Sequence, residues 1–592
     1  MLRIAVAQFR PTKAEYQENL RRAGDIFRGL ALDPDPPHLV VFPETAFTGY
    51  FLEGGVQEVA LPAEDFYDDL SRLHREAGCP PLDLVAGFYE VWRSRLHNSA
   101  LAASLGGPEP GIRHVHRKVF LPTYGVFDEE RFVEPGLTVE AFDLAWGRAA
   151  VIVCEDAWHS LMPTVAALDG AQCLVVVSAS PARGVSPSSD TDTRPESVRR
   201  WERTGRGIAA EHGIYVVLAQ LVGFEGGKAF LGGSCVIGPR GELLAAAPIF
   251  EEALLRVEID LDEVTRARAE TPLLSDLEIR LPHLIESLVH RRRGEPRLPP
   301  NGAGGVSRKT IKAPQRARLA EDPLAIDPEL VRTWLVEFIR DEVRRRRGFD
   351  CAVVGLSGGV DSALVATLAA EALGPGNVTA IRMPYRTSSR ESMSHADLVI
   401  ASTGIRADTV EISGAVDALA AALPEPPDPA RLGNIMARTR MVVLFDRSAA
   451  LRALPLGTGN KSERLLGYFT WHADDSPPVN PIGDLFKTQV WALARHLGVP
   501  AVIVAKPATA DLVAGQTDEG DFGISYGRAD LILHWLLLGY GPGEVEALGY
   551  STEEVALVRN RLESTHWKRR LPTVAMLSPT AIGEYYLRPV DY

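Results

Sequence analysis

The sequence is poor in cysteine and has no long apolar run. Its 592 residues include five cysteines, which are scattered, odd in number and never in Cys-x-x-Cys spacing: Cys79, Cys154, Cys173, Cys235 and Cys351. This pattern gives no zinc-binding framework and is typical of a protein in a reducing cytoplasm. Because no stretch reaches about 18 consecutive apolar residues, no membrane span is expected.

The sequence also has no excess of basic residues. Its net charge is −14 and is spread along the chain, which argues against a nucleic-acid-binding surface. The first nine residues, 1–9, contain neither a long apolar stretch nor a cleavage site, so we expect a first strand rather than a signal peptide. A chain of 592 residues is too long for one core, so two or more domains are expected.

In the first half, to about residue 285, short apolar runs alternate with helical patterns, as at 39–42, 149–154 and 173–178. This alternation predicts an α/β domain whose catalytic residues stand at strand ends. Glu44, Lys118 and Cys154 each occupy such an end. Taken singly, each has a plain structural alternative. Glu44 could cap a helix, Lys118 could be a solvated surface lysine, and Cys154 could be inert core packing.

Three strings carry these residues in order: FPETAFTGY, HRKVFLPTYGVFDEERF and VCEDAW. They resemble the nitrilase (carbon–nitrogen hydrolase) superfamily, and the resemblance spans nearly the whole first half. It implies an α-β-β-α sandwich. It further implies that Glu129 supports the catalytic residues and that Tyr124 and Ser180 contact glutamine.

The residue types indicate how such a site would work. A thiol is mostly protonated at neutral pH, so Cys154 needs a nearby base, for which Glu44 is the candidate. Lys118 is the candidate to stabilise the oxyanion of the tetrahedral intermediate.

The sequence departs from this resemblance after Ser180-Pro181. Glutamine-using relatives usually continue shortly with Gly-Lys, whereas this chain has Arg183, which we expect to meet the substrate carboxylate. The polar loop that follows, 186–196, is either a mobile lid or a surface insertion.

A stretch rich in proline, glycine and charge separates the two halves. It predicts three parts: a nitrilase-like domain at 1–285, a linker at 286–323 and a second α/β domain at 324–592. The basic residues of the linker suit a solvated segment better than an anion-binding patch.

The second half is organised around residues 351–373, which read as a buried strand, a sharp turn and a helix. The turn presents free backbone N–H groups at a helix N-terminus, which suits a phosphate. An ordinary tight strand–helix connection is the plain alternative. The expected ATP-binding residues of the turn are Leu356, Ser357, Gly358, Gly359, Val360, Asp361 and Ser362.

A later strand ends in Gly457–Glu463, which adds Thr458 and a second carboxylate. Asp361 and Glu463 could share a magnesium ion that bridges the phosphates, although each alone could be a solvated turn acid. The turn at 357–362 resembles the loop of the ATP-pyrophosphatase superfamily, whose members form adenylates and release pyrophosphate. This resemblance implies a Rossmann-like domain with a parallel sheet in the second half.

Seven strings of the second half resemble the NAD synthetase family: GLSGGVDSAL, NIMARTRM, LGTGNKSE, GYFTWHADD, PIGDLFKTQV, GQTDE and HWKRR. The join to a nitrilase-type domain resembles its glutamine-dependent form. Lys487 and Thr509 match positions that contact ATP. The positions that match the binding site for nicotinate adenine dinucleotide (deamido-NAD) are Asn434, Arg438, Glu463 and Lys568.

The resemblance implies ATP- and Mg²⁺-dependent amidation of nicotinate adenine dinucleotide to NAD, with ammonia taken from glutamine. It also implies a cytoplasmic homo-oligomer, joined through the synthetase domain, with small-molecule substrates and no nucleic-acid or membrane partner. Three alternatives stay open: free ammonia or another amide as donor, another amidating adenylase, and a nucleotide-sensing scaffold. The string Ser476-Pro-Pro478 departs from relatives, which often have glycines and an acid there, so contact to the nicotinate end is expected to differ.

Overall fold

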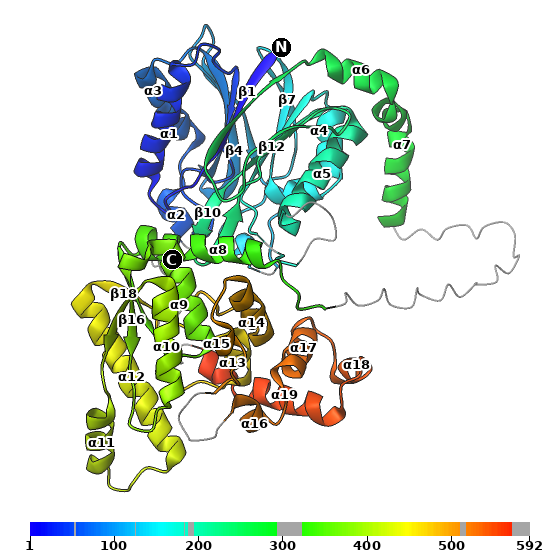
Figure 1. Ribbon diagram of the computed structural model, residues 1–592. Coiled ribbons are helices and arrows are strands. Elements are labelled where there is room, and N and C mark those ends of the chain that lie inside the picture. Colours follow the sequence, from blue (N-terminus) through cyan, green and yellow to red (C-terminus); the bar gives the residue numbers. More distant parts are fainter. Residues whose placement is uncertain are drawn as a thin grey trace, which may run out of the picture. The chain divides into compact units, whose positions relative to one another are not determined.

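The structure is a computed structural model that describes residues 1–52, 55–124, 126–182, 184–186, 194–292, 322–509 and 517–570. These residues form two compact units. Within the described ranges, the first unit takes 1–184 and 195–292, and the second takes 185–194 and 322–570. Figure 1 draws the first in blue to green and the second in green to red.

The first unit contains two six-stranded sheets. One has the order β14 (Ala253–Ile259), β1 (Leu2–Gln8), β2 (Leu39–Val41), β3 (Leu82–Trp92), β4 (Arg95–Leu105), β5 (Gly111–Arg117). The other has the order β13 (Leu243–Ala246), β12 (Cys235–Ile237), β9 (Tyr215–Gln220), β8 (Cys173–Ser178), β7 (Gly147–Val153), β6 (Ala141–Leu144). A separate hairpin joins β10 (Val222–Glu225) and β11 (Lys228–Leu231).

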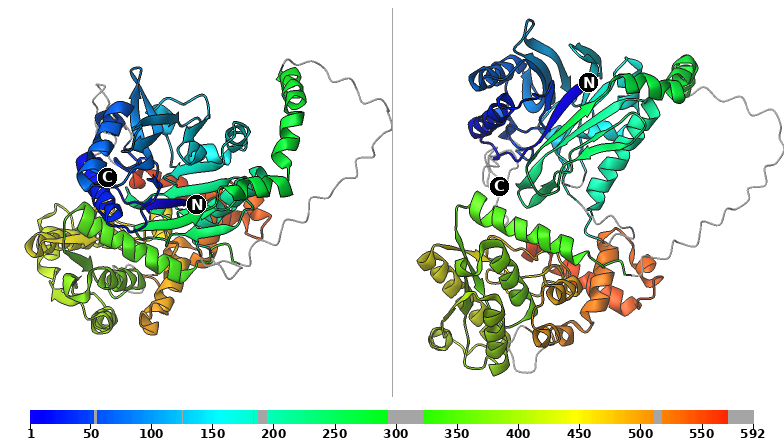
Figure 2. Two further views of the ribbon diagram at one scale, coloured as in Figure 1. Left: turned by 90° about the horizontal axis from the view of Figure 1, so that it is seen from above. Right: turned by 45° about the horizontal axis from the view of Figure 1, so that its top comes forward.

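Helices cover the outer face of each sheet (Figure 1, Figure 2). On the first sheet these are α1 (Tyr16–Ala31) and α3 (Ala63–Ala77), and on the second α4 (Leu161–Leu168) and α5 (Glu196–His212). The inner faces meet in one buried core that includes Val41, Val85, Ile152 and Val175. The predicted α-β-β-α sandwich is therefore confirmed. The remaining helices are α2 (Val56–Val59), α6 (Asp262–Glu270) and α7 (Leu273–Arg292).

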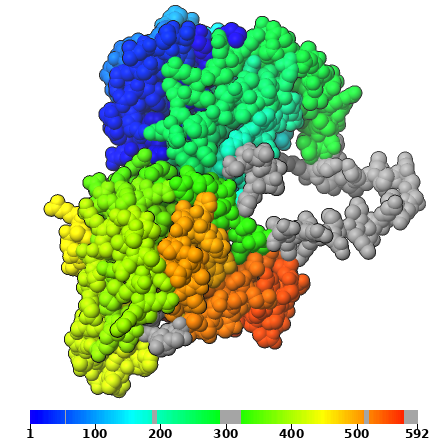
Figure 3. Space-filling view, viewed as in Figure 1, coloured from blue at the N-terminus to red at the C-terminus, as the bar shows by residue number. Residues whose placement is uncertain are grey.

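The parallel strands β7, β8 and β9 are continuous apolar runs because both of their faces are covered. Strand β3 is longer than its apolar run at 84–87, because it continues into an antiparallel hairpin with β4. The first and last strands of this unit, β1 and β14, pair antiparallel along their whole length. In Figure 3 the blue atoms of N-terminal residues accordingly lie beside green atoms of much later residues.

The second unit is built on a four-stranded parallel sheet of order β17 (Arg406–Thr409), β16 (Val378–Arg382), β15 (Cys351–Gly355), β18 (Ala453–Leu456). The helices around this sheet are α8 (Pro328–Arg340), α9 (Val360–Leu373), α10 (Arg390–Thr403), α11 (Ser413–Ala422), α12 (Pro429–Leu451), α14 (Lys487–His496) and α15 (Ala501–Val504). The parallel sheet predicted for the second half is therefore confirmed.

A further helical cluster has its own core, which contains Phe486, Phe522, Tyr526 and Trp535. It includes α13 (Lys461–Leu466), α16 (Asp518–Phe522), α17 (Tyr526–Leu537), α18 (Pro542–Glu546) and α19 (Thr552–Ser564). Among the described residues, no helix has the length and apolar character needed to span a membrane.

Two elements differ from the sequence expectation. The sequence predicts a helix over 327–347. Helix α8 begins after the N-cap Asp327, but the last turn of this stretch, Asp341–Arg346, is π-helical. Helix α7 continues to Arg292, past the expected domain end at 285, because its pattern of good helix formers continues. The domain limits at 285 and 323 stay predictions.

Candidate active sites

In the first unit, the structure brings together the four residues predicted to be catalytic. The ammonium Nζ of Lys118 lies 2.9 Å from Oε1 of Glu44 and 2.7 Å from Oε2 of Glu129. Both carboxylates and the lysine are buried, and so is Cys154. Glu44 and Lys118 lie close enough to the Cys154 thiol for their charges to shift its pKa. Residues distant in sequence thus meet because Glu44, Lys118 and Cys154 follow the ends of β2, β5 and β7.

Three groups that sequence reasoning missed hold the two carboxylates. The side-chain amide of Asn98 donates to Oε1 of Glu44 at 2.7 Å and to Oε1 of Glu129 at 2.5 Å. The backbone N–H of Ala179 donates to Oε2 of Glu44 at 2.5 Å, and the hydroxyl of Tyr50 donates to Glu129 at 3.2 Å. Every oxygen of the pair therefore has a donor, which is what burying two carboxylates requires.

Cys154 stands on a sharp turn between β7 and a 3-10 turn, Cys154–Trp158. Its φ is +44°, a left-handed conformation that is strained for a residue with a side chain. Such strain is concentrated at functional positions. The hydroxyl of Ser178, at the end of β8, donates to Sγ at 3.3 Å.

The surroundings shift the pKa values of this cluster. Burial, and then the charge of Glu44, raise the pKa of the Cys154 thiol well above its usual value. Burial also raises the pKa of Glu129. Burial alone would lower the pKa of Lys118, but Glu129 and Glu44 raise it well above its usual value. At neutral pH the thiol is therefore protonated and the lysine charged, so the nucleophile needs a base.

The structure describes only some of the residues that are predicted to contact glutamine. Tyr124 is 55% exposed, and its hydroxyl donates to Oε2 of Glu155, the residue after Cys154, at 2.8 Å. Ser180 is half-buried, two residues beyond Ser178. Arg183 and most of the loop 186–196 lie outside the described residues. The glutamine-binding assignment stays a prediction.

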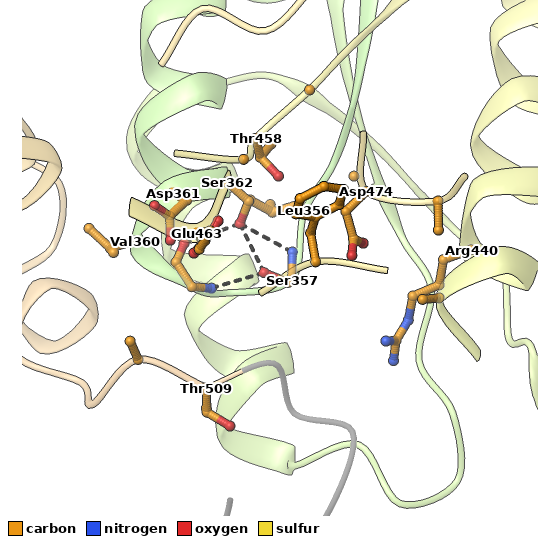
Figure 4. A pocket seen from close by; sticks show the side chains of 18 of the residues that line it. Leu356, Ser357, Val360, Asp361, Ser362, Arg440, Thr458, Glu463, Asp474 and Thr509 are labelled. Atoms are coloured by element: carbon orange, nitrogen blue, oxygen red, sulfur yellow. Dashed lines mark hydrogen bonds between the residues drawn. The ribbon is translucent and has the colours of Figure 1, made fainter. Parts of the chain in front are cut away.

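The second unit has a cavity of about 320 Å³ at the carboxyl ends of β15, β16 and β18 (Figure 4). Ten of the residues predicted to bind nucleotide or metal line it: Leu356, Ser357, Gly359, Val360, Asp361, Ser362, Thr458, Glu463, Lys487 and Thr509. In Figure 4 the side chains of Asp361, Ser362 and Glu463 lie together near Ser357, with Thr458 close to them. The cavity occurs where a parallel sheet binds its ligands.

The loop before α9 is shaped by Gly358. Its φ is +79°, and a Cβ added there would lie 2.2 Å from the carbonyl oxygen of Ser392. No residue with a side chain fits without moving that backbone. Ser362 Oγ lies 3.1 Å from Ser357 Oγ and accepts from the Ser357 N–H at 3.3 Å, so the loop is internally braced at the helix N-terminus.

Lys487 lies between the two acids predicted to hold magnesium. Its Nζ is 2.5 Å from Oδ2 of Asp361 and 3.4 Å from Oε1 of Glu463. Asn460, which the sequence analysis did not single out, donates to Oδ1 of Asp361 at 2.9 Å and caps the helix that carries Glu463. Burial and then Asp361 raise the pKa of Glu463 to about 8. Burial alone would lower the pKa of Lys487, but Asp361 and Glu463 outweigh burial and raise it.

A buried carboxylate on α17 fixes both sides of this arrangement. Oδ2 of Asp530 accepts from the N–H and the hydroxyl of Thr488 at 3.0 and 2.9 Å, and its Oδ1 accepts from the hydroxyl of Ser462 at 2.5 Å. Ser462 in turn accepts from the N–H of Lys487 at 2.9 Å. The start of α14 is thereby tied to the helix of Glu463.

The residues matched to the deamido-NAD site fall into two groups. Glu463 lines the cavity, whereas Asn434, Arg438 and Lys568 are not among its lining residues. Those three instead contact the segment 467–471 through Thr470, the Trp471 carbonyl, and the Gly467 and Phe469 carbonyls. On the cavity itself, α12 presents Arg440, which donates from Nε to the Met383 carbonyl at 3.2 Å.

Among the described residues, no group of three or more His, Cys, Asp or Glu side chains is arranged to hold a metal ion. The donors that do converge are the carboxylates of Asp361 and Glu463, now bridged by the Lys487 ammonium. Two carboxylates completed by phosphate oxygens and water suit Mg²⁺, so this pair fits a magnesium ion that is bound together with a nucleotide.

Comparison with known proteins agrees with the family resemblance of both halves of the chain. Residues 3–269 match the carbon-nitrogen hydrolase family, and residues 331–572 match the NAD synthase family. A relative, the NH(3)-dependent NAD(+) synthetase of Trichlorobacter lovleyi, is 48% identical over 270 residues, which are 45% of this chain and 98% of the relative.

Two solved structures extend over nearly the whole chain. The glutamine-dependent NAD+ synthetase from Acinetobacter baumannii in complex with ADP has a TM-score of 0.64 at 24% identity, covering 97% of this chain and 95% of that one. That from Cytophaga hutchinsonii has a TM-score of 0.69 at 17% identity, covering 96% and 93%. At these identities the likeness establishes the two-part fold. The chain belongs to the NAD synthase family and carries a carbon-nitrogen hydrolase domain ahead of its synthase domain.

Proposed function

We propose that this protein makes NAD by amidating nicotinate adenine dinucleotide, using ATP and ammonia that its first unit releases from glutamine. One observation carries the proposal. The same chain holds a buried Glu44–Lys118–Glu129 cluster acting on Cys154 and a phosphate-loop cavity with two acids at its edge. An amide-cleaving site has a use in this chain if the other site consumes ammonia.

In the second unit, ATP occupies the cavity and the dinucleotide brings its nicotinate carboxylate to it. The loop 356–362 holds the phosphates with its backbone N–H groups and with Ser357 and Ser362. A magnesium ion held by Asp361 and Glu463 would neutralise phosphate charge. The nicotinate carboxylate attacks the α-phosphorus of ATP, pyrophosphate leaves, and the carboxylate becomes an adenylate. Ammonia then displaces AMP to give the nicotinamide.

In the first unit, glutamine binds with its side-chain amide against Cys154. Glu44 takes the thiol proton as the sulfur attacks the amide carbon. Lys118 stabilises the oxyanion that forms, and Glu44 passes the proton to the leaving ammonia. Water then hydrolyses the thioester and releases glutamate. The raised thiol pKa fits a nucleophile that is ionised only as it reacts.

Two further proposals follow from the chemistry. Ammonia is mostly protonated in neutral water and would be lost there, so we propose a protected route from one site to the other. The family resemblance also supports a homo-oligomer joined through the synthetase domain. Tyr124, Ser180 and Arg183 are proposed for glutamine, and Asn434, Arg438, Glu463 and Lys568 for the dinucleotide.

A substrate screen with the purified chain tests the proposal. AMP release is measured for nicotinate adenine dinucleotide and for other carboxylate acceptors, each with glutamine and with ammonium. We expect NAD with either nitrogen donor, and only the ammonium-driven reaction in Cys154→Ala. Full glutamine-driven synthesis by Cys154→Ala would contradict the proposed nucleophile.

The same screen separates the alternatives. NAD formation from ammonium alone would mean that the chain works like the NH(3)-dependent relative, with the first unit serving another amide. AMP release with a different acceptor would indicate another amidating adenylase. Nucleotide binding without AMP release for any acceptor would indicate a sensing scaffold.

A further inference from the structure

A second acid close to Cys154 takes no part in the chemistry proposed above. Asp156, two residues beyond Cys154, is fully buried and accepts four hydrogen bonds. Its Oδ1 accepts from the backbone N–H groups of Val119 and Phe120 at 3.0 and 2.9 Å. Its Oδ2 accepts from the backbone N–H of Val153 at 3.1 Å and is 2.9 Å from Nε2 of His116.

The donors come from two different sheets. His116 is in β5 of the first sheet, and Val119 and Phe120 come shortly after that strand, whereas Val153 ends β7 of the second sheet. Lys118 stands between His116 and Val119, and Cys154 stands between Val153 and Asp156. The carboxylate therefore holds the His116 side chain before the lysine, the backbone after the lysine and the backbone next to the cysteine.

Asp156 is the link between the segment that carries Lys118, 116–120, and the segment that carries Cys154, 153–156. Within the described part of the chain, the hydrogen bonds between these two segments all end on the Asp156 side chain. Aliphatic packing between the sheets does not fix atomic positions to within tenths of an ångström. Hydrogen bonds are directional, so four of them to one carboxylate do. A shift of about 1 Å in a reacting group can cost about 10²-fold in rate.

We propose that Asp156, oriented by His116, is a positioning residue that fixes the Lys118 ammonium relative to the Cys154 sulfur. It touches neither substrate nor reacting atoms. Its effect is exerted when the oxyanion forms, because that is when the distance between sulfur and ammonium matters. The inference rests on the proposed glutaminase function of the first unit.

The side chain of His116 has a defined part in this arrangement. It is 1% exposed, and an Nε2–H is the group that can donate to the Asp156 carboxylate. Its donation leaves Oδ2 with two donors, as Oδ1 has. A glutamine at this position would present an N–H at about the same reach, whereas an alanine would present none.

The test compares glutamine hydrolysis, read as glutamate release, with ammonium-driven NAD formation in the full chain. For Asp156→Asn we expect the kcat of glutamine hydrolysis to fall about 10²-fold while the KM for glutamine stays nearly constant. Ammonium-driven synthesis should be unchanged, because it depends on the second unit. Asp83→Asn is the matched control. Asp83 is a buried acid at the start of β3 that accepts a hydrogen bond from the hydroxyl of Ser104, and its variant should keep both activities.

A histidine pair gives an independent readout. His116→Ala should lower the kcat of glutamine hydrolysis, and His116→Gln, which keeps a donor for Asp156, should restore most of it. If Asp156→Asn fails to fold, this pair decides. Wild-type kcat in Asp156→Asn, or equal rates in the two histidine variants, would overturn the proposal. Absence of glutamine hydrolysis in the wild-type chain would instead reject the proposed function.

Discussion

Lys118 is a charged side chain with no solvent exposure, held between two carboxylates that are also buried. A buried ion cluster of this kind is costly to form, because each ion loses its water. Removing the single cation leaves two carboxylates without compensation, which costs more than losing an exposed ion pair. The cluster is thus maintained for its chemistry and makes the first unit sensitive to any change of charge.

The variant Lys118→Met tests this at the residue scale. We expect the first unit to lose about 3–5 kcal/mol of stability, measured by urea unfolding, because Glu44 and Glu129 are left unpaired. Glutamine hydrolysis should fall by at least about 10²-fold. Adding Glu129→Gln should recover part of the stability but none of the hydrolysis. Unchanged stability in the single variant would show that the lysine does not compensate the acids.

Glu463 gives a pH-dependent prediction. Its pKa is raised from 4.5 to about 8, so between these values the folded protein holds a proton that the unfolded chain has lost. This contribution to stability is complete below pH 4.5 and is lost as the pH rises through about 8. The slope is at most about 1.4 kcal/mol per pH unit.

The measurement is urea unfolding of the ligand-free protein at pH 5, 6, 7 and 8, roughly the window in which the protonation of Glu463 differs between the folded and unfolded states. We expect Glu463→Gln to lose stability less steeply with rising pH than the wild type. Equal slopes in the two proteins would mean that Glu463 has an ordinary pKa.

At the scale of elements, the phosphate loop depends on a backbone contact. The carbonyl oxygen of Ser392, at the start of α10, occupies the space that a side chain at position 358 would need. The loop and α10 are therefore packed backbone to backbone. The sequence string alone indicates a glycine at this point, but it does not indicate which element approaches it.

Gly358→Ala should displace the loop and lower NAD formation about 10²-fold with either nitrogen donor. Glutamine hydrolysis should persist, because Gly358 lies in the other unit. Gly376→Ala is the control. An added Cβ there meets nothing within 4 Å and its φ is not in the left-handed region, so that variant should keep both activities. NAD formation at the wild-type rate in Gly358→Ala would contradict the close approach.

The strand ends could be predicted because they are local. Apolar runs followed by Glu44, Cys154 or Asp361 carry their signal within a few residues. The groups that support them could not be predicted in this way. Asn98 lies 54 residues from Glu44, and Asn460 lies 99 residues from Asp361. Each is a single polar residue within an otherwise ordinary segment, so only the assembled sheets reveal its partner.

For the whole molecule, each unit has its own core. Among the described residues, the sandwich core consists of first-unit residues, and the sheet and helical cores of the second unit consist of second-unit residues. Ligands of one site should therefore stabilise the unit that binds them. Calorimetry of the full chain should show two transitions, because domains with separate cores tend to unfold separately.

A nucleotide titration tests this expectation. Mg-ATP at about 100 times its Kd should stabilise the second unit by about 2.7 kcal/mol and raise one transition only. Gly358→Ala should abolish the shift. A single transition that moves as a whole with Mg-ATP would instead mean that the two units unfold cooperatively.

The ammonium of Lys487 stands between Asp361 and Glu463. The positive charge of this lysine thus lies at the position expected for a divalent ion. A bare cation arriving alone would have to displace a charge that already satisfies both acids, and it would gain little. When a triphosphate enters, its oxygens offer the lysine a new partner and the ion a larger coordination sphere. Metal and nucleotide should consequently load as one complex, and the chain should discriminate against free cations even where these are abundant.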